Sequence, residues 1–147
     1  MKKLIIILFA GIIMANLQAY AQKNEKLEAL KAEFSGAVPS GFELDESGVD
    51  GVNLYVVYKK SPQEIISVNL QQDHRLEFSD TENLTVDGRE AVFYYAGYQK
   101  SGGLAITLKN EAGHLIIGYN KPYMGDENVK MAELTAIAEK VDLAMFE

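Results

Sequence analysis

Apolar and polar positions alternate with a period of two through the middle of the chain, which is the pattern of half-buried β-strands. In the clearest case Ile66, Val68 and Leu70 alternate with Ser67 and Asn69. Runs of this kind predict strands at 42–44, 54–58, 66–70, 84–86, 90–98, 104–108 and 115–119. The turns between them are short, whereas parallel neighbours need a long crossover, so we expect antiparallel strands.

Turn-forming residues separate the predicted strands. Asp87-Gly88 favours a type I′ hairpin, because both central residues of that turn need a positive φ. Gly102-Gly103 predicts the next reversal, and residues 110–113 predict another. The acidic stretch 45–51 is interpreted as a hairpin loop, since it is rich in turn formers and lacks the EF-hand spacing. Loosely bound calcium remains an open alternative there.

Helical periodicity flanks the strands on both sides. A first helix is predicted from about Asn24, its cap, to Phe34. The residues on its apolar face are Leu27, Leu30 and Phe34. A second helix is predicted over 127–143, with Asp126 as its cap. Its apolar stripe consists of Met131, Leu134, Ile137, Ala138, Val141 and Met145. An antiparallel sheet of about six or seven strands, with an N-terminal and a C-terminal helix packed on it, is an α+β fold.

The first 21 residues have the three parts of a secretory signal peptide. Lys2 and Lys3 form a basic start, residues 4–14 are an apolar run, and the pattern Ala-Tyr-Ala at 19–21 is a cleavage site. Cleavage after this pattern leaves one α+β domain over residues 22–147. The protein is therefore predicted to be exported, to the periplasm or outside the cell.

A retained membrane anchor is the alternative interpretation of this segment. A spanning helix needs about 20 predominantly apolar residues, and here Asn16 and Gln18 interrupt the apolar run. No stable membrane insertion is therefore expected after cleavage. The chain has no cysteine, which excludes a lipid anchor at a cysteine. Export without disulfides is typical of a bacterial envelope protein rather than of a small extracellular eukaryotic domain.

The charge balance limits the classes of partner. Fourteen Lys and Arg against 21 Asp and Glu give a net charge of −7. Loss of Lys2 and Lys3 with the signal peptide would remove two positive charges and lower the net charge to −9. Such a surface repels phosphate backbones and anionic membranes, and no basic cluster forms a nucleic-acid footprint. No nucleic-acid partner is predicted.

The two histidines are the first candidates for chemistry. His74 and His114 have no second His or Cys at metal-ligand spacing, and no nucleophile-elbow motif accompanies them. Solvated or turn-capping histidines are the favoured interpretation, and no metal, cofactor or enzymatic activity is predicted. A hydrolase, the third hypothesis below, would have to use Asp73, His74 and a serine. The serines considered are Ser67 and Ser79.

Tyrosine is the strongest functional signal. The chain has eight tyrosines and no tryptophan. Tyr94 and Tyr98 are predicted to share one face of a strand, with aromatic residues on its other face as well. An exposed aromatic surface would suit a protein, peptide or glycan. The candidate binding residues are Tyr94, Tyr98, Tyr55 and Tyr58. The alternative is that these tyrosines pack on the sheet, because tyrosine favours pleated surfaces.

Three segments together resemble a known kind of small exported bacterial domain. They are the run at 84–95, the hairpin at 104–119 and the end of the closing helix at 138–141. Together they are similar to PsbP-like and DcrB-like modules, whose "Gly-x-x-Ala" strand corresponds to residues 88–91 here. The resemblance implies a sheet covered by helices and an accessory or binding role, and it carries over no catalytic residue.

Three hypotheses for function follow, in order of preference. The first is a non-enzymatic exported binding or accessory module of the bacterial cell envelope, which contacts a protein, peptide or glycan through sheet tyrosines or loops. The second is a carrier of a small apolar ligand in an enclosed cavity between the sheet and the C-terminal helix, of about 300 Å³ or more. The third is a hydrolase of unknown type, which would need a nucleophile, a base and an orienting group within hydrogen-bond reach.

Overall fold

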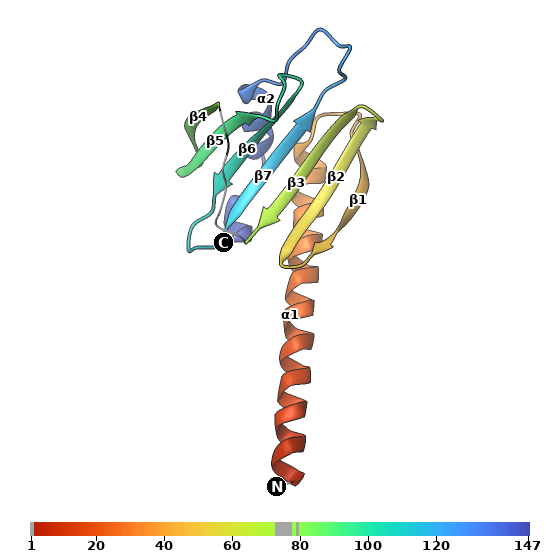
Figure 1. The fold of residues 1–147 in the computed structure, drawn as a ribbon, viewed down its shortest axis with the longest axis vertical. Coiled ribbons are helices and arrows are strands. Elements are labelled where there is room, and N and C mark those ends of the chain that lie inside the picture. Colours follow the sequence, from red (N-terminus) through yellow and green to blue (C-terminus); the bar gives the residue numbers. More distant parts are fainter. Residues whose placement is uncertain (1, 73–77, 79) are drawn as a thin grey trace.

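The computed structural model describes the backbone of residues 2–72, 78 and 80–147. Side chains are described for residues 18–72, 78 and 80–147. One long helix precedes seven strands, and two short helices follow them (Figure 1). The elements are α1 Lys2–Ala37, β1 Glu43–Asp50, β2 Asn53–Ser61, β3 Glu64–Gln71, β4 Thr81–Val86, β5 Arg89–Tyr95, β6 Ser101–Thr107, β7 His114–Asn120, α2 Met131–Ala138 and the 3₁₀ helix η1 Leu143–Phe146.

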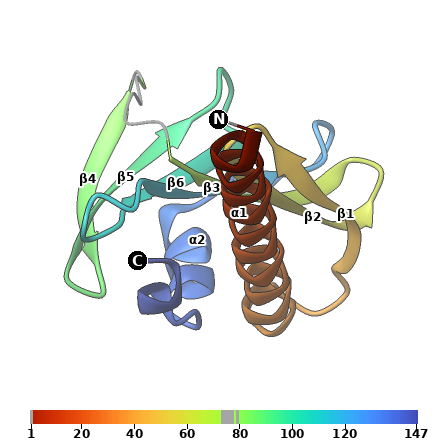
Figure 2. The ribbon, with the colours of Figure 1, turned by 90° about the horizontal axis from the view of Figure 1, so that it is seen from below.

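The seven strands form one antiparallel sheet in the order β1-β2-β3-β7-β6-β5-β4. Two meanders, β1 to β3 and β4 to β7, are therefore joined where β3 pairs with β7. Both α1 and α2 lie on the same face, and the sheet curves around them (Figure 2). The predicted α+β fold is confirmed.

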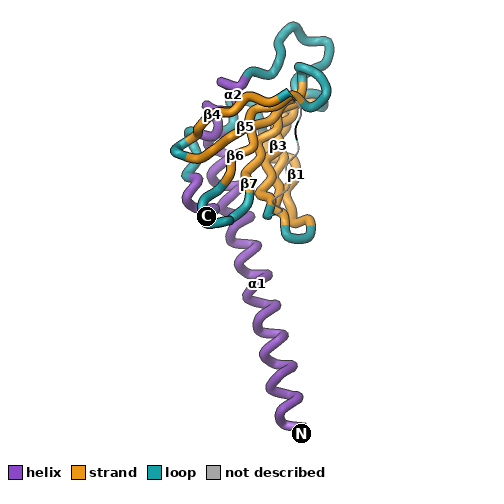
Figure 3. The backbone as a smooth tube through the Cα atoms, turned by 60° about the vertical axis from the view of Figure 1, so that its left-hand side comes forward, coloured by secondary structure: helices purple, strands orange, loops and turns teal. Residues whose placement is uncertain are grey.

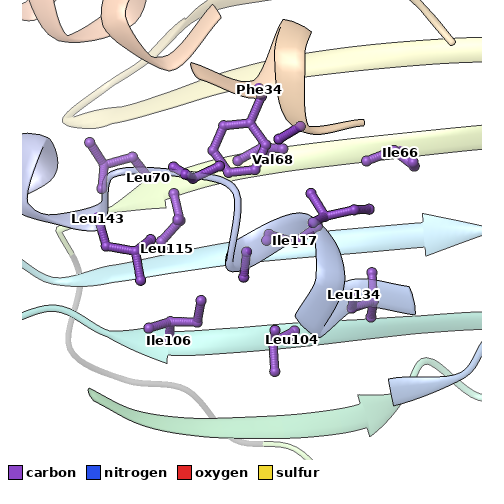
Figure 4. Packing of buried hydrophobic residues seen from close by; sticks show 14 of the residues in the cluster. Phe34, Ile66, Val68, Leu70, Leu104, Ile106, Leu115, Ile117, Leu134 and Leu143 are labelled. Atoms are coloured by element: carbon purple, nitrogen blue, oxygen red, sulfur yellow. The ribbon is translucent and has the colours of Figure 1, made fainter. Parts of the chain in front are cut away.

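The core lies between the sheet and the two helices (Figure 4). Leu30 and Phe34 of α1 and Leu134 of α2 are buried against the strands. The strand residues that meet them include Leu54, Val56, Ile66, Val68, Leu70, Leu104, Ile106, Leu115 and Ile117. Burial of one such side chain stabilises the fold by about 1.5–3 kcal/mol. The alternation seen in the sequence thus identifies the inward face of each central strand correctly.

Two of the predicted turns have the backbone conformation that the sequence predicts. Asp87 and Gly88 have φ values of 48° and 69°, as a type I′ turn between β4 and β5 requires. The turn between β6 and β7 carries positive φ at Asn110, Glu111 and Gly113. Both predictions are confirmed.

The start of the first helix was predicted wrongly. α1 continues through Asn24 and through the predicted cleavage site, and its N-terminal part extends away from the sheet (Figure 1). No glycine or proline occurs between residues 12 and 34, and an asparagine inside a helix costs well under 1 kcal/mol, so nothing local ends the helix at Asn24. The searched part of the described chain contains no helix that is both long and apolar enough to cross a membrane.

The C-terminal helix is shorter than predicted at both ends. Lys130 precedes α2, and its backbone N–H donates to the Glu133 carboxylate at 2.8 Å. After α2 the chain turns, and the Asp142 carboxylate accepts from the backbone N–H of Ala144 at the start of η1. This turn ends the helical period, so Met145 is exposed and falls outside the core stripe.

Two loop predictions were also wrong. The acidic stretch 45–51 lies mostly in the edge strand β1, where a bulge follows Leu44. Gly102-Gly103 lies inside β6, and the reversal before it contains Gly97, with a φ of 83°. Gly103 pairs with Tyr94 and Gly118, and glycine suits this strand position because a Cβ there would collide with the Tyr94 ring.

A candidate binding surface at one end of the sheet

The β5–β6 loop and the β7–α2 loop lie side by side at the same end of the sheet (Figure 3). The backbone N–H of Val129 donates to the carbonyl of Gln99 at 2.9 Å. The N–H of Lys121 donates to the carbonyl of Lys100 at 2.8 Å. These bonds continue the pairing of the sheet beyond its last strand residues.

Side chains connect the same two loops. The Lys100 ammonium donates to the Gly125 carbonyl at 2.5 Å, and the Asn128 amide donates to Gln99 Oε1 at 2.6 Å. Four hydrogen bonds therefore hold the loops to each other. A surface fixed in this way loses little conformational freedom when it binds.

Three large apolar side chains project from these loops. The exposed fractions are 49% for Tyr98, 73% for Tyr123 and 88% for Met124. The rings of Tyr98 and Tyr123 meet edge-on, with centroids 6.1 Å apart and planes inclined at 72°. We name these three residues the loop-end surface. Grouped exposed apolar side chains are typical of contact sites.

Lys121 anchors the β7–α2 loop from beneath. Its side chain is only 6% exposed. The ammonium donates to Glu133 Oε1 at 2.8 Å and to the Asn128 carbonyl at 3.1 Å. It also lies 3.5 Å from Glu127 Oε2 and 5.4 Å from the centre of the Tyr119 ring. Because a buried ammonium needs such partners, Lys121 fixes the loop that carries Tyr123 and Met124.

A hollow of about 290 Å³ lies beside this loop. Its lining residues are Lys60, Glu64, Tyr119, Lys121, Pro122, Gly125, Asp126, Glu127 and Glu133. The Tyr119 hydroxyl donates to Glu64 Oε1 at 2.9 Å. Burial, and then this bond to Glu64, raise the pKa of Tyr119, so the phenol stays protonated. Four carboxylates against two lysines leave the hollow negative.

A second hollow, of about 230 Å³, lies beside Tyr98. The other described residues that line it are Asp80, Tyr95, Gly97 and Gln99. The Tyr95 hydroxyl donates to the Val129 carbonyl at 3.3 Å and thereby ties β5 to the β7–α2 loop. The loop-end surface therefore stands between two hollows with carboxylates in their walls.

Tyr94 and Tyr98 do not share a face, which corrects the prediction. β5 ends at Tyr95, and Tyr98 lies in the loop after it. Tyr94 points to the face of the sheet opposite the helices, where its ring stacks on Phe78 at 3.8 Å. Burial raises the pKa of Tyr94. Of the predicted binding residues, only Tyr98 belongs to the loop-end surface.

Tyr58 is a core residue, so its assignment to an exposed contact surface is wrong. It is 1% exposed, its hydroxyl donates to the Lys31 carbonyl of α1 at 3.0 Å, and burial raises its pKa to about 12. Tyr55 lies half-buried on the opposite face, over Gly48 of β1. Its hydroxyl donates to Glu46 Oε1 at 2.8 Å, and that bond raises its pKa.

Sequence reasoning gave no role to Tyr123 and Met124. Both fall in the Pro- and Gly-containing segment 121–128, between a strand and a helix. Aromatic and sulfur-containing side chains inside such a turn-rich segment have few core positions to occupy. That combination was the signal in the sequence that could have identified them.

Of the residues considered for a hydrolase, only Ser67 lies in the described part of the chain. Asp73, His74 and Ser79 lie outside the described residues. Ser67 lies on the face of β3 opposite the helices, and His114 begins β7, with Nδ1 3.4 Å from Thr107 Oγ1. Among the residues searched, which exclude the undescribed ones, no group of three or more His, Cys, Asp or Glu side chains is placed to hold a metal.

No protein-family model, curated protein or solved structure matches the chain. The resemblance to PsbP-like and DcrB-like modules therefore stays a prediction.

Proposed function

We propose that the protein is an exported, non-enzymatic binding or accessory module of the bacterial cell envelope, which contacts its partner through the loop-end surface. The observation that carries this proposal is the grouping of Tyr98, Tyr123 and Met124, which are 49%, 73% and 88% exposed on loops tied together by hydrogen bonds. Tyrosine and methionine are enriched where proteins contact their partners.

The energetics of the surface favour this use. Apolar area removed from water contributes about 25 cal/mol per Å², and exposed aromatic residues often become the centres of binding energy. The loop–loop hydrogen bonds reduce the entropy that ordering would otherwise cost. A partner therefore gains contact area on a surface that is already in place.

The carrier hypothesis has less support. It places an apolar ligand between the sheet and α2, where Leu134, Ile137 and Ala138 pack against strand residues of the core. These side chains occupy that space (Figure 4). The hydrolase hypothesis gains no support from the described residues, because they include only Ser67 of the residues considered for it.

Export is compatible with the way α1 packs. Among the α1 side chains that the structure describes, from residue 18 onward, the buried ones are Leu30, Phe34 and Ala37, which follow the predicted cleavage site. Loss of residues 1–21 would leave these contacts in place. This supports, as part of the proposal, a processed domain that begins at Gln22 in the periplasm or outside the cell.

The experiment is a comparison of two triple variants in envelope preparations. Tyr98→Ser, Tyr123→Ser and Met124→Ser remove the loop-end surface. Leu44→Ser, Val49→Ser and Val52→Ser remove apolar residues that are 46%, 41% and 51% exposed elsewhere. Each protein carries a photo-crosslinking amino acid at position 96, an exposed alanine of the β5–β6 loop.

We expect crosslinks from the wild type and from the control variant, and their loss in the surface variant. Thermal unfolding should change little in the surface variant, because substitutions of exposed residues usually alter stability by about 0.5 kcal/mol or less. Equal crosslinking by both variants, or none from the wild type, would contradict the proposal.

A further inference from the structure

We propose that the partner presents a polypeptide segment in which apolar side chains are flanked by lysine or arginine. This inference rests on the proposed function and names the chemistry of the molecule that the loop-end surface receives. It is carried by the shape of the apolar surface and by the charges that surround it.

The shape of the surface suits side chains better than sugar rings. Tyr98 and Tyr123 present faces in two directions, since their planes are inclined at 72°. A flat platform for a sugar would need ring faces that lie in one plane. Met124, 88% exposed and next to Tyr123 in the chain, is unbranched and polarizable, and it adapts to irregular apolar shapes. A notch of this kind fits branched or aromatic side chains of a peptide.

The free charges around the surface are mostly negative. Asp126 and Glu127 follow Met124 closely in the same loop and are exposed. Asp80 is exposed in the wall of the hollow beside Tyr98. Neither aspartate takes part in an ion pair or side-chain hydrogen bond among the described residues. Carboxylates that lack a cation within the molecule can receive one from a partner.

The nearby lysines are fewer than the nearby carboxylates. Lys121 is paired with Glu133 and Glu127, and Lys100 donates to the Gly125 carbonyl. Lys130 is exposed at the start of α2 and leaves the carboxylates in excess. The net charge of the whole chain, −7, is also negative. Complementary charge steers association and suppresses partners of like charge.

The test uses four defined probes and one signal. The probes are a peptide of alternating leucine and lysine, the same peptide with glutamate for lysine, the same peptide with serine for leucine, and an N-acetylglucosamine oligomer. The signal is the ¹³C-methyl resonance of Met124 in the full chain, assigned with Met124→Leu. The methyl of Met145, 48% exposed on η1, is the internal control.

We expect the leucine–lysine peptide to shift the Met124 resonance and to leave Met145 unchanged. Its affinity should exceed that of the other three probes by about tenfold. It should also fall several-fold at 1 M salt, where the screening length is about 3 Å. Asp80→Asn with Asp126→Asn should weaken it about fivefold or more, because two unpaired carboxylates are lost.

The matched control is Glu25→Gln with Glu111→Gln, which removes the same charge from α1 and from the β6–β7 turn. It should leave the affinity within about twofold of the wild type, because both sites lie toward the opposite end of the sheet and salt screens distant charges. Glu25 lies near Lys23, which bonds the β1–β2 turn, and Glu111 lies in the β6–β7 turn. Equal weakening by both charge variants would overturn the inference, since net charge alone would then explain it.

The outcomes separate this inference from the proposed function. If the glutamate peptide or the sugar oligomer shifts Met124 as strongly as the leucine–lysine peptide does, the partner chemistry is wrong and the binding surface stands. If no probe shifts Met124, the inference is overturned. The crosslinking comparison then decides on the proposed function independently.

Discussion

The two ends of the β4–β7 meander each contain a buried cation, and the two ends use it differently. At one end Arg89, whose side chain is 3% exposed, lies between the β4–β5 turn and η1. At the other end Lys121, 6% exposed, lies beneath the β7–α2 loop. Both cations join segments that are distant in sequence.

At the Arg89 end, hydrogen bonds join the β4–β5 turn, the β6–β7 turn and the residue after η1; we call this the closed end. Arg89 Nε donates to Glu147 Oε1 at 2.6 Å, and its Nη1 bonds to the carbonyl and the carboxylate of Asp87. Glu147 also accepts from the backbone N–H of Lys109 at 3.0 Å. Phe146 and Leu143 are buried beside this cluster. Met145 is the one large exposed apolar side chain of η1, at 48%, whereas three are grouped at the other end.

The Lys121 end presents a surface instead. The β7–α2 loop spans residues 121–130, and Lys121 holds its backbone while Tyr123 and Met124 project outward. The difference indicates that a buried ion pair does not by itself reveal whether a region is structural or functional. The exposed apolar side chains above it make that distinction.

The largest loss of stability is expected when the ion pair between Arg89 and Glu147 is removed. Arg89→Ala leaves the Glu147 carboxylate, 11% exposed, without its cation. Loss of one partner of a buried pair costs about 3 kcal/mol. Urea unfolding should show this loss, while the leucine–lysine peptide should bind as it does to the wild type at temperatures where the variant is folded. A loss below about 1 kcal/mol would mean that Arg89 does not close this end.

The stability that the Arg89–Glu147 pair provides should depend on pH. The hydrogen bond from Arg89, and then the one from the Lys109 backbone, hold the pKa of Glu147 below its usual value. A lowered pKa in the folded state stabilises the protein above the unfolded-state pKa, about 4.3, and this stabilisation is lost as pH falls through the folded-state pKa. The wild type should therefore exceed Glu147→Gln in unfolding free energy at pH 7, with the difference shrinking below about pH 4.3. A difference that is constant with pH would contradict this account.

A smaller effect on stability is expected at the open end. Lys121→Met keeps the apolar stem and removes the ammonium. Glu127, 75% exposed, can return to water, so the cost should be about 2 kcal/mol, less than for Arg89→Ala. The β7–α2 loop should loosen, which hydrogen exchange at the Val129 N–H would detect. Unchanged protection of that N–H would show that the backbone bond to Gln99 suffices without Lys121.

The strands were the most predictable part of the fold. Ile66, Val68 and Leu70 alternate with polar neighbours because one face of the sheet meets the helices, and that constraint is visible within five residues. The Asp87-Gly88 turn was equally local, since it depends only on positive φ at two positions.

The positions of element ends were less predictable. Alternation continues past Tyr95 in the sequence, and the end of β5 depends on the pairing of β6, which stops at Tyr95. Tyr98 was therefore assigned to the face of Tyr94. The C-terminal helix ended early for a comparable reason, because the turn after Ala138 and the cap at Asp142 allow Leu143 and Phe146 to reach the core.

The sequence by itself determined the α+β class, the inward face of each central strand and the Asp87-Gly88 hairpin, because these follow from the period of the chain and from single residues. Only the tertiary structure decided which loops meet. It pairs β3 with β7, brings Gln99 beside Val129, and buries Lys121 against Glu133 of α2. These contacts join residues far apart in the chain, and the exposed surface of Tyr98, Tyr123 and Met124 exists only after they form.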